Sequence, residues 1–197
     1  MNGAVRTNTR DIARAAIRFE LAQVAFDLFR REGFDNVTVN DLAAAAGVSR
    51  STFLRYFGSK EDAVLGAVDI QGEQVVAALR ARPADEGDWA ALRRALDTVT
   101  ELHRRDPGGA LAMSQLIMRT PALGARTLEK QNGWRPAIAQ ALAERADPSW
   151  PTLLVPSVRA AAAVDCLNVA VDGWTASDGH LDLDALLDEA FAAFAPG

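Results

Sequence analysis

The chain has 197 residues and a formal net charge of −5, with 49% hydrophobic and 24% charged residues. This length allows one compact core with a small appendage or two small domains, and the composition is globular rather than disordered. No uncharged run reaches the roughly 18–20 apolar residues of a membrane span, and the polar start is unlike a secretory signal. We therefore expect a cytoplasmic protein that has no membrane partner.

Residues that build catalytic and metal sites are scarce. The chain has two histidines, His103 and His180, and a single cysteine, Cys166, which excludes an internal disulfide. Too few histidines and cysteines are present to favour a histidine–cysteine metal site or a serine–histidine–aspartate triad. We also find no phosphate-binding loop or paired-carboxylate motif. We predict a protein that is not an enzyme and has no catalytic residue, metal or cofactor.

Charge is distributed unevenly along the chain. Residues 1–60 hold nine Lys or Arg and six Asp or Glu, a net +3, whereas residues 61–197 hold twelve and twenty, a net −8. A basic N-terminal third attached to an acidic remainder is typical of a small polyanion-binding module, although ordinary fluctuation explains an excess of this size equally well.

The hydrophobic pattern is helical along nearly the whole chain, with no convincing alternation of period two. An amphipathic helix is expected over residues 11–32, ended by Gly33. Three further helices begin at capping sequences. The capping box Thr38–Asp41 opens a short helix that ends at Ala46, and Ser49 caps a second short helix over Arg50–Phe57. A second capping box, Ser59–Asp62, opens a long helix. Phenylalanines in this region, Phe19, Phe26, Phe29, Phe34, Phe53 and Phe57, are predicted to form its core.

Helical stripes continue in the rest of the chain. A linker over Pro83–Gly87 precedes a stripe from Trp89 to His103, and Pro107–Gly109 is expected to break the chain before a helix over Leu111–Met118. Pro136 should kink or interrupt a helix from about Pro121 to Arg145, because proline lacks a backbone donor. A loop at Asp147–Pro156 and a break at Ser177–His180 precede the last two stripes, one with Val164, Leu167, Val171 and Trp174 and one with Leu183, Leu187, Ala190 and Phe194. We predict an all-α fold of about nine helices.

The two short helices meet at Gly47 with the spacing of a helix-turn-helix. Ala43 lies four residues before this glycine and Phe53 six residues after it. A small residue allows the helices to cross closely, glycine takes the turn, and the phenylalanine anchors the second helix. On this pattern alone, an ordinary helical hairpin is the alternative to a DNA-binding motif.

The flanking sequence is more specific. From Phe19 to Ala67 the chain resembles the DNA-binding domain of the TetR family of bacterial transcriptional regulators. The residues that carry the resemblance are Ala25–Phe29, Glu32–Phe34, Val37–Val39, Asp41–Ala43, Ala46–Ser49, Thr52–Phe53, Arg55–Phe57 and Ser59–Asp62. The resemblance implies a helix-turn-helix DNA-binding domain over residues 1–60 and an effector-binding and dimerisation domain over residues 61–197.

The resemblance also implies which residues contact DNA. The recognition helix would be Arg50–Phe57, with Arg50 as the candidate for reading guanine and Tyr56 at a position that often contacts phosphate. Leu54 stands where the family often has tyrosine, which puts one phosphate contact in doubt. The expected DNA-binding residues are Thr38, Asn40, Ser49, Arg50, Ser51, Thr52, Leu54, Arg55, Tyr56 and Lys60. For Arg55 and Lys60, an exposed charge without a DNA contact is the alternative.

In this family the last two helices usually pair with those of a second copy. That implies a homodimer interface formed by Val164, Leu167, Val171, Trp174, Leu183, Leu187, Phe191 and Phe194. Packing of the same residues within one subunit is the alternative.

A ligand cavity is the other expected feature of the C-terminal domain. Its candidate residues combine apolar side chains with a few polar ones: Trp89, His103, Met113, Met118, Thr127, Gln131 and Trp134. The domain is similar to TetR-type regulators that respond to acyl-CoA-like effectors, so a long apolar effector is the first hypothesis, and aromatic ligands of the multidrug type are the second.

These expectations describe a DNA-binding transcriptional regulator that responds to a ligand. It would be a homodimeric repressor of a palindromic double-stranded DNA operator, released by an acyl-CoA-like or other small apolar effector. The alternative is a helical small-molecule sensor that acts through a protein partner without DNA binding, and Leu54 is its only support.

Overall fold

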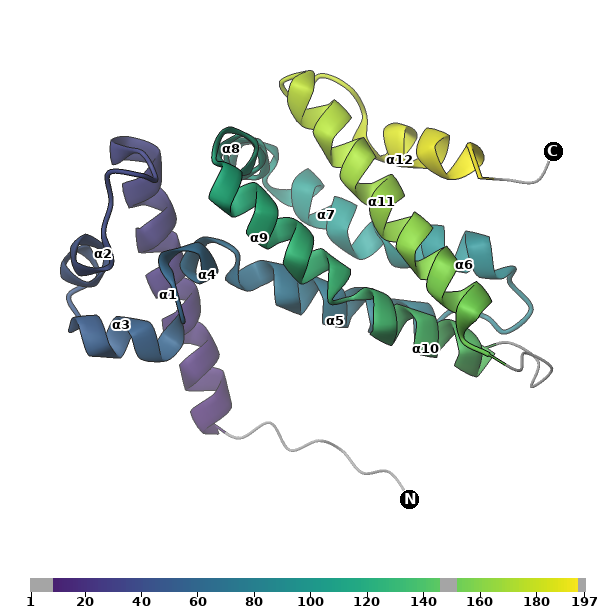
Figure 1. Cartoon of the computed structure of the whole chain (residues 1–197), viewed down its shortest axis with the longest axis horizontal. Coiled ribbons are helices and arrows are strands. Elements are labelled where there is room, and N and C mark those ends of the chain that lie inside the picture. The colour runs from purple at the N-terminus through teal and green to yellow at the C-terminus, as the bar shows by residue number, and fades with distance from the viewer. Residues whose placement is uncertain (1–8, 146–151, 195–197) are drawn as a thin grey trace. The chain divides into compact units, whose positions relative to one another are not determined.

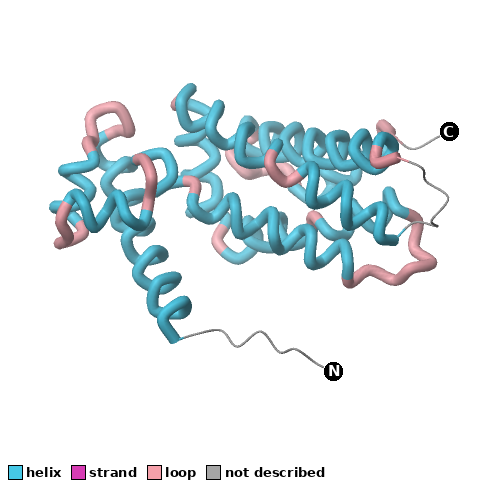
Figure 2. The backbone as a smooth tube through the Cα atoms, turned by 60° about the horizontal axis from the view of Figure 1, so that its bottom comes forward, coloured by secondary structure: helices cyan, strands magenta, loops and turns pink. Residues whose placement is uncertain are grey.

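The computed structural model of the protein describes residues 9–145 and 152–194, and all regular secondary structure in these ranges is helical (Figures 1 and 2). The predicted all-α fold is therefore confirmed. The helices are α1 (Thr9–Glu32), α2 (Val39–Ala45), α3 (Arg50–Tyr56), α4 (Lys60–Val64), α5 (Gly66–Arg80), α6 (Asp88–Ala95), α7 (Asp97–Arg105), α8 (Pro107–Arg119), α9 (Pro121–Asn132), α10 (Arg135–Arg145), α11 (Leu154–Ala176) and α12 (Leu183–Ala192).

The described residues form twelve helices rather than about nine because three of the expected helices are each divided. Leu65 separates α4 from α5, Leu96 separates α6 from α7, and Gly133–Trp134 separates α9 from α10. The last break agrees with the predicted interruption near Pro136, which lies in the first turn of α10, where its missing N–H costs no hydrogen bond.

Two other prolines lie in the first turn of helices that were expected to start later. Pro107 is the first residue of α8, and the Asp106 side chain caps that helix by accepting a hydrogen bond from Gly109 N at 3.0 Å. The expected break between α7 and α8 is present but lies at Asp106 rather than at Pro107–Gly109, and the helix begins before Leu111, because proline is well suited to a first helical position. Likewise, α11 begins at Leu154 and includes Pro156, so the expected loop at Asp147–Pro156 ends earlier than predicted, and its residues 147–151 lie outside the described residues.

The chain separates into two compact units, residues 1–66 and residues 67–197. In the first unit, α1, α2, α3 and α4 surround a core of Leu21, Ala25, Leu28, Phe29, Phe34, Val37, Leu42, Ala43, Phe53 and Phe57. The rings of Phe29 and Phe34 are 4.8 Å apart and those of Phe53 and Phe57 are 5.2 Å apart. Phe26 is half-buried, and the prediction for Phe19 is wrong, since it lies on the outer face of α1 and is 61% exposed.

The second unit packs α5 to α12 around one core. In Figure 1, α11 runs along α10 and α12. Nine residues of α11 are buried, among them Val164, Leu167 and Trp174. By length and composition α11 would also pass as a membrane span, a test that the core helix of a water-soluble protein passes as well. Its nine buried residues pack in the core of the second unit, while other apolar residues of the same helix are exposed.

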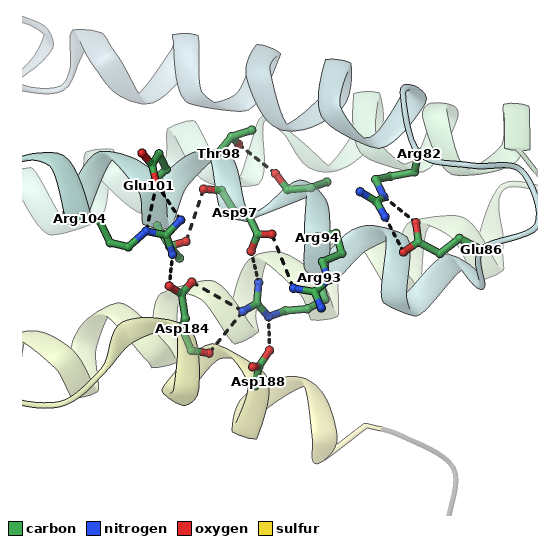
Figure 3. Close-up of polar contacts among 12 residues, drawn as sticks. Arg82, Glu86, Arg93, Arg94, Asp97, Thr98, Glu101, Arg104, Asp184 and Asp188 are labelled. Carbon is green, nitrogen blue, oxygen red and sulfur yellow. Dashed lines mark hydrogen bonds and ion pairs between the residues drawn. The ribbon is translucent and has the colours of Figure 1, made fainter.

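A network of charges fastens α12 to α6 and α7 (Figure 3). Arg93, only 8% exposed, donates at 2.5 Å to Asp188 on α12 and at 2.5 Å to Asp97 on α7. Asp184 also faces Arg93 and accepts a hydrogen bond from Arg104. The last helix is therefore held by long-range ion pairs as well as by its apolar face.

Candidate nucleic-acid interface and ligand cavities

The first helix of the helix-turn-helix, α2, begins at a complete capping box. Thr38 Oγ1 accepts a hydrogen bond from Asp41 N at 3.3 Å, and Asp41 Oδ2 accepts from Thr38 N at 2.9 Å and from the Thr38 hydroxyl at 2.6 Å. These bonds from Thr38 hold the pKa of Asp41 below its ordinary value. Thr38 and Asn40 are exposed, so both remain accessible at the start of α2.

The turn between α2 and α3 depends on Gly47. Its φ is +66°, in the left-handed region that disfavours a side chain. Just after it, Ser49 Oγ accepts from Thr52 N at 3.1 Å and donates to Thr52 Oγ1 at 2.9 Å, and it lies 3.0 Å from Ser51 Oγ. The start of α3 is thus fixed locally, as the sequence predicted.

The two faces of α3 differ in chemistry. Phe53 is fully buried, and Arg50, Ser51 and Arg55 are exposed. Among the described residues, neither Arg50 nor Arg55 has an ion-pair partner; the Arg55 guanidinium only lies 5.7 Å from the centre of the Tyr56 ring. Thr52, Leu54 and Tyr56 are half-buried at the border between the faces. The outer face of α3 therefore carries free guanidinium groups, which suit phosphate and guanine.

Lys60, also predicted to contact DNA, has partners within the first unit. Its Nζ donates to Phe34 O at 2.9 Å and to Val37 O at 3.2 Å, and lies 4.2 Å above the Phe34 ring. These contacts tie the start of α4 to the segment between α1 and α2. Two of the three donors of the ammonium group are therefore used inside the unit, which leaves one for a phosphate.

Comparison with known proteins agrees with this geometry. Residues 21–66 match the family profile described as bacterial regulatory proteins, tetR family, and residues 86–197 match the profile described as the MftR C-terminal domain. The chain belongs to the TetR family. Proteins of this family are DNA-binding transcriptional regulators that respond to ligands. The family prediction made from residues 19–67 is confirmed.

Two bacterial transcriptional regulators are related to the chain in sequence. The HTH-type transcriptional regulator TcmR of Streptomyces glaucescens is 34% identical over 134 residues, which span 65% of this chain and 59% of TcmR. MftR of Mycobacterium tuberculosis, named as a mycofactocin biosynthesis transcriptional regulator, is 30% identical over 139 residues, 67% of each chain.

Solved structures of TetR-family proteins share the fold. A regulator from Streptomyces coelicolor superimposes with a TM-score of 0.58 and 20% identity over 97% of this chain and 96% of its own. FadR of Thermus thermophilus, determined in complex with lauroyl-CoA, superimposes with a TM-score of 0.56 and 22% identity, and the match covers 91% of this chain and 99% of FadR. At these identities the likeness concerns the fold alone.

One cavity in the described part of the second unit is the α5/α9 groove. It has a volume of about 540 Å³ and is lined by Asp69, Gly72, Glu73, Val76, Ala77, Arg80, Arg126, Glu129, Lys130, Gly133, Trp134 and Ala137. The buried Trp134 lies directly against Gly72, where an added Cβ would be 2.3 Å from Trp134 Cδ1. Among the described residues its indole Nε1 has no hydrogen-bond partner.

A smaller cavity, the α7/α8 cavity, has a volume of about 350 Å³. Its lining residues come from α7, the first half of α8, the end of α11, the α11–α12 connection and the start of α12: Thr100, His103, Arg104, Pro107, Gly108, Leu111, Trp174, Asp178, Gly179, Asp182, Leu183 and Asp184. The His103 and Trp174 rings meet edge to face at 5.2 Å. Burial lowers the pKa of His103, although a hydrogen bond with Val99 O opposes this, so the ring is neutral near pH 7.

The structure does not bring the seven predicted ligand-binding residues together. Trp134 lines the α5/α9 groove and His103 lines the α7/α8 cavity. Trp89, on α6, instead packs against α12, and its Nε1 donates to Phe191 O at 3.0 Å. The other four lie on α8 and α9: Met113, Thr127 and Gln131 are half-buried, and Met118 is 51% exposed.

The residues predicted at a dimer interface face mostly inward. The subunit's own core includes Val164, Leu167, Trp174, Leu183, Leu187 and Phe191, whereas Val171 is half-buried and Phe194 is 60% exposed. Because apolar residues occur on the outward as well as the inward side of α11, periodicity alone did not separate the two faces. The outward apolar residues that sequence analysis missed are Leu154, Val155, Val158 and Val169.

Proposed function

We propose that the protein is a cytoplasmic, homodimeric repressor that binds a palindromic operator and leaves it when a small apolar effector binds. The observation that carries this proposal is the exposed face of α3, where Arg50 and Arg55 have no ion-pair partner among the described residues. An arginine at the start of a recognition helix can donate two hydrogen bonds to O6 and N7 of guanine.

Within each half-site, base reading and backbone contact fall to different residues. Arg50 and Ser51 lie at the exposed start of α3 and would face base edges, while Arg55 and Tyr56 lie about one and a half turns further on and would face phosphate. Thr38 and Asn40 would add phosphate contacts from the start of α2. Lys60 can add only the donor that Phe34 O and Val37 O leave unused.

The proposed homodimer is supported by the outward face of α11. Leu154, Val158 and Val169 are 61–69% exposed and lie on a helix whose opposite face is already buried. These outward apolar residues would be buried by a second copy of α11. A symmetric pair would place two recognition helices about 34–36 Å apart, or a multiple of this distance.

The α5/α9 groove is the proposed effector site. Trp134, Val76 and Ala137 supply apolar surface, and Arg80, Arg126 and Lys130 supply cations around it. FadR of Thermus thermophilus and FadR of Bacillus subtilis were determined with lauroyl-CoA and stearoyl-CoA, which supports an acyl-CoA-like effector as the first hypothesis. Such an effector would exchange carboxylate partners of these cations, such as Asp69 on Lys130, for its own phosphates.

Selection of DNA sequences from a random pool, followed by fluorescence anisotropy, tests the DNA-binding part. We expect a palindromic sequence to be enriched and its affinity to fall steeply with salt. Arg50→Ala should reduce the preference for that sequence by about 1–3 kcal/mol, while Arg55→Ala should weaken binding to all sequences similarly. No enrichment of any palindrome would contradict the proposal and favour a sensor that acts through a protein partner.

Release from the selected DNA tests the effector part separately. Lauroyl-CoA should lower the affinity for the operator, and free CoA, which lacks the apolar chain, should not. Two variants that each remove one negative charge are compared for their response to lauroyl-CoA. Glu73→Gln makes the change at the groove, and Asp85→Asn, in the loop between α5 and α6, is the control away from it. Equal responses to lauroyl-CoA and to free CoA would remove the support for an acyl effector but leave DNA binding intact.

A further inference from the structure

The α7/α8 cavity lies in a strongly acidic part of the chain. Residues 160–197 contain seven Asp or Glu and neither lysine nor arginine. Three of these carboxylates, Asp178, Asp182 and Asp184, line the cavity, and Arg104 is the cation among its lining residues. Asp184 is held by Arg104 and Arg93, so Asp178 and Asp182 carry the excess negative charge. Arg104 is itself paired with Glu101 at 2.8 Å and with Asp184 (Figure 3). The excess of negative charge around the cavity therefore favours a positively charged ligand.

The polar groups of the cavity offer acceptors rather than donors. Asp178 Oδ1 accepts from Gln115 Nε2 at 2.9 Å and Asp182 Oδ1 accepts from Ala185 N at 3.0 Å. Within the described part of the chain, the second oxygen of each has no hydrogen-bond partner. His103 Nδ1 lies 3.0 Å from Val99 O, so in the neutral ring Nδ1 carries the proton and Nε2 is a free acceptor.

The remaining wall is apolar and closely packed. Trp174 is only 5% exposed and still lines the cavity, together with Leu111 and Leu183. Gly179 has φ +74°, which disfavours a side chain, and lies beside the indole, where a Cβ would be in ordinary contact with Trp174 Cζ2 at 3.5 Å. An aromatic wall next to carboxylates suits a group that is both positive and organic.

We propose that the α7/α8 cavity is a second ligand site, distinct from the α5/α9 groove, and that it binds a small organic cation. The ammonium group would lie between Asp178, Asp182 and His103 Nε2, and the apolar body would pack on Trp174 and Leu111. An anionic ligand is disfavoured because it would face three carboxylates with one cation that is already paired.

Three probes of similar shape and different charge test the charge preference: 2-phenylethylammonium, 2-phenylethanol and 3-phenylpropionate. Isothermal titration of the full chain with each should give binding of the cation at least about tenfold tighter than that of the alcohol, the value of one charge-assisted hydrogen bond. The carboxylate should bind most weakly. Equal affinity for the alcohol, tightest binding of the carboxylate, or no binding of the cation would overturn the proposal.

Two substitutions locate the site while they preserve the local backbone. Asp178→Asn keeps a residue that tolerates φ +52°, and Asp182→Asn keeps a good N-cap for α12. Each should weaken binding of 2-phenylethylammonium about five- to tenfold. Asp85→Asn, in the exposed loop between α5 and α6, makes the same charge change away from the cavity and should leave the affinity unchanged. Unchanged affinity in both cavity variants, or a loss caused instead by Glu73→Gln in the α5/α9 groove, would place the cation elsewhere.

Discussion

The two units differ in the distance along the chain over which their decisive contacts run. In the first unit, helix starts are fixed by bonds that span three residues, such as Thr38 to Asp41 and Ser49 to Thr52. In the second unit, Arg93 reaches Asp188 over 95 residues and Trp89 reaches Phe191 over 102. Local hydrogen bonds therefore organise the helix-turn-helix, whereas both cavities depend on packing between distant helices.

The difference shows why the local geometry of the proposed DNA-binding helix was predictable and that of the cavities was not. A DNA-binding surface on α3 needs only a helix whose buried and exposed faces are known, and Phe53 and Arg50 define them. A cavity needs the positions of several helices at once. The α7/α8 cavity combines Leu111, Trp174 and Leu183 from three different helices, and no sequence interval relates them.

The largest expected effect concerns the long-range contacts of the second unit. Arg93→Met should lower the free energy of unfolding of that unit by about 2–4 kcal/mol, because Asp97, Asp184 and Asp188 lose a nearly buried partner. The loss of unfolding free energy stays within this range because water partly screens the exposed carboxylates. Urea unfolding followed by tryptophan fluorescence measures it directly, since all four tryptophans lie beyond residue 66.

Arg94→Met is the matched control for this measurement. Arg94 is exposed and lies 3.9 Å from Asp97, so its replacement should change stability by less than about 0.5 kcal/mol. A neutral or stabilising Arg93→Met would mean that desolvation of the guanidinium offsets its ion pairs. In that case apolar packing alone would hold α12.

How far the sequence predicted the structure follows the same division. The caps at Thr38 and Ser49 and the glycine turn at Gly47 were predictable because each depends on a few adjacent residues. On α11, helical spacing identified the stripe with Val164 and Trp174, but periodicity does not tell whether such a stripe faces the subunit or a partner. The ligand residues were dispersed for a related reason: Trp134 and His103 share apolar surroundings but line different cavities.

Gly72 offers the next largest effect and tests how closely the second unit is packed. Gly72→Ala would place a Cβ 2.3 Å from Trp134 Cδ1, so we expect a loss of about 1–3 kcal/mol and a shift in the emission of Trp134. Gly108→Ala is the control, because no atom lies within 4 Å of its added Cβ and alanine favours the helix. Similar stabilities for the two variants would show that Trp134 moves aside at little cost.

Lys60 is the exception in the first unit, since its contacts span 23 and 26 residues. Lys60→Met should destabilise the first unit by about 1–2 kcal/mol, because Phe34 O and Val37 O lose a charged donor. Arg55→Met removes an exposed charge and should change stability by less than about 0.5 kcal/mol. Thermal unfolding by circular dichroism, combined with amide exchange of α2 and α3, separates the two. If Lys60→Met weakened DNA binding without any loss of stability, its main role would be phosphate contact.

The smallest effect is the pH dependence of one local cap. The hydrogen bonds from Thr38 depress the pKa of Asp41 in the folded state below the value of about 3.9 for an unperturbed aspartate. The ionised cap therefore contributes its full stabilisation above about pH 5 and loses it as the pH falls through the depressed pKa. Asp41→Asn should reduce the stability of the first unit at pH 7, and the difference from the wild-type chain should shrink on acidification. Urea unfolding by circular dichroism at several pH values measures this difference. If it stayed constant down to pH 3, the cap would act through hydrogen-bond geometry and its charge would be irrelevant.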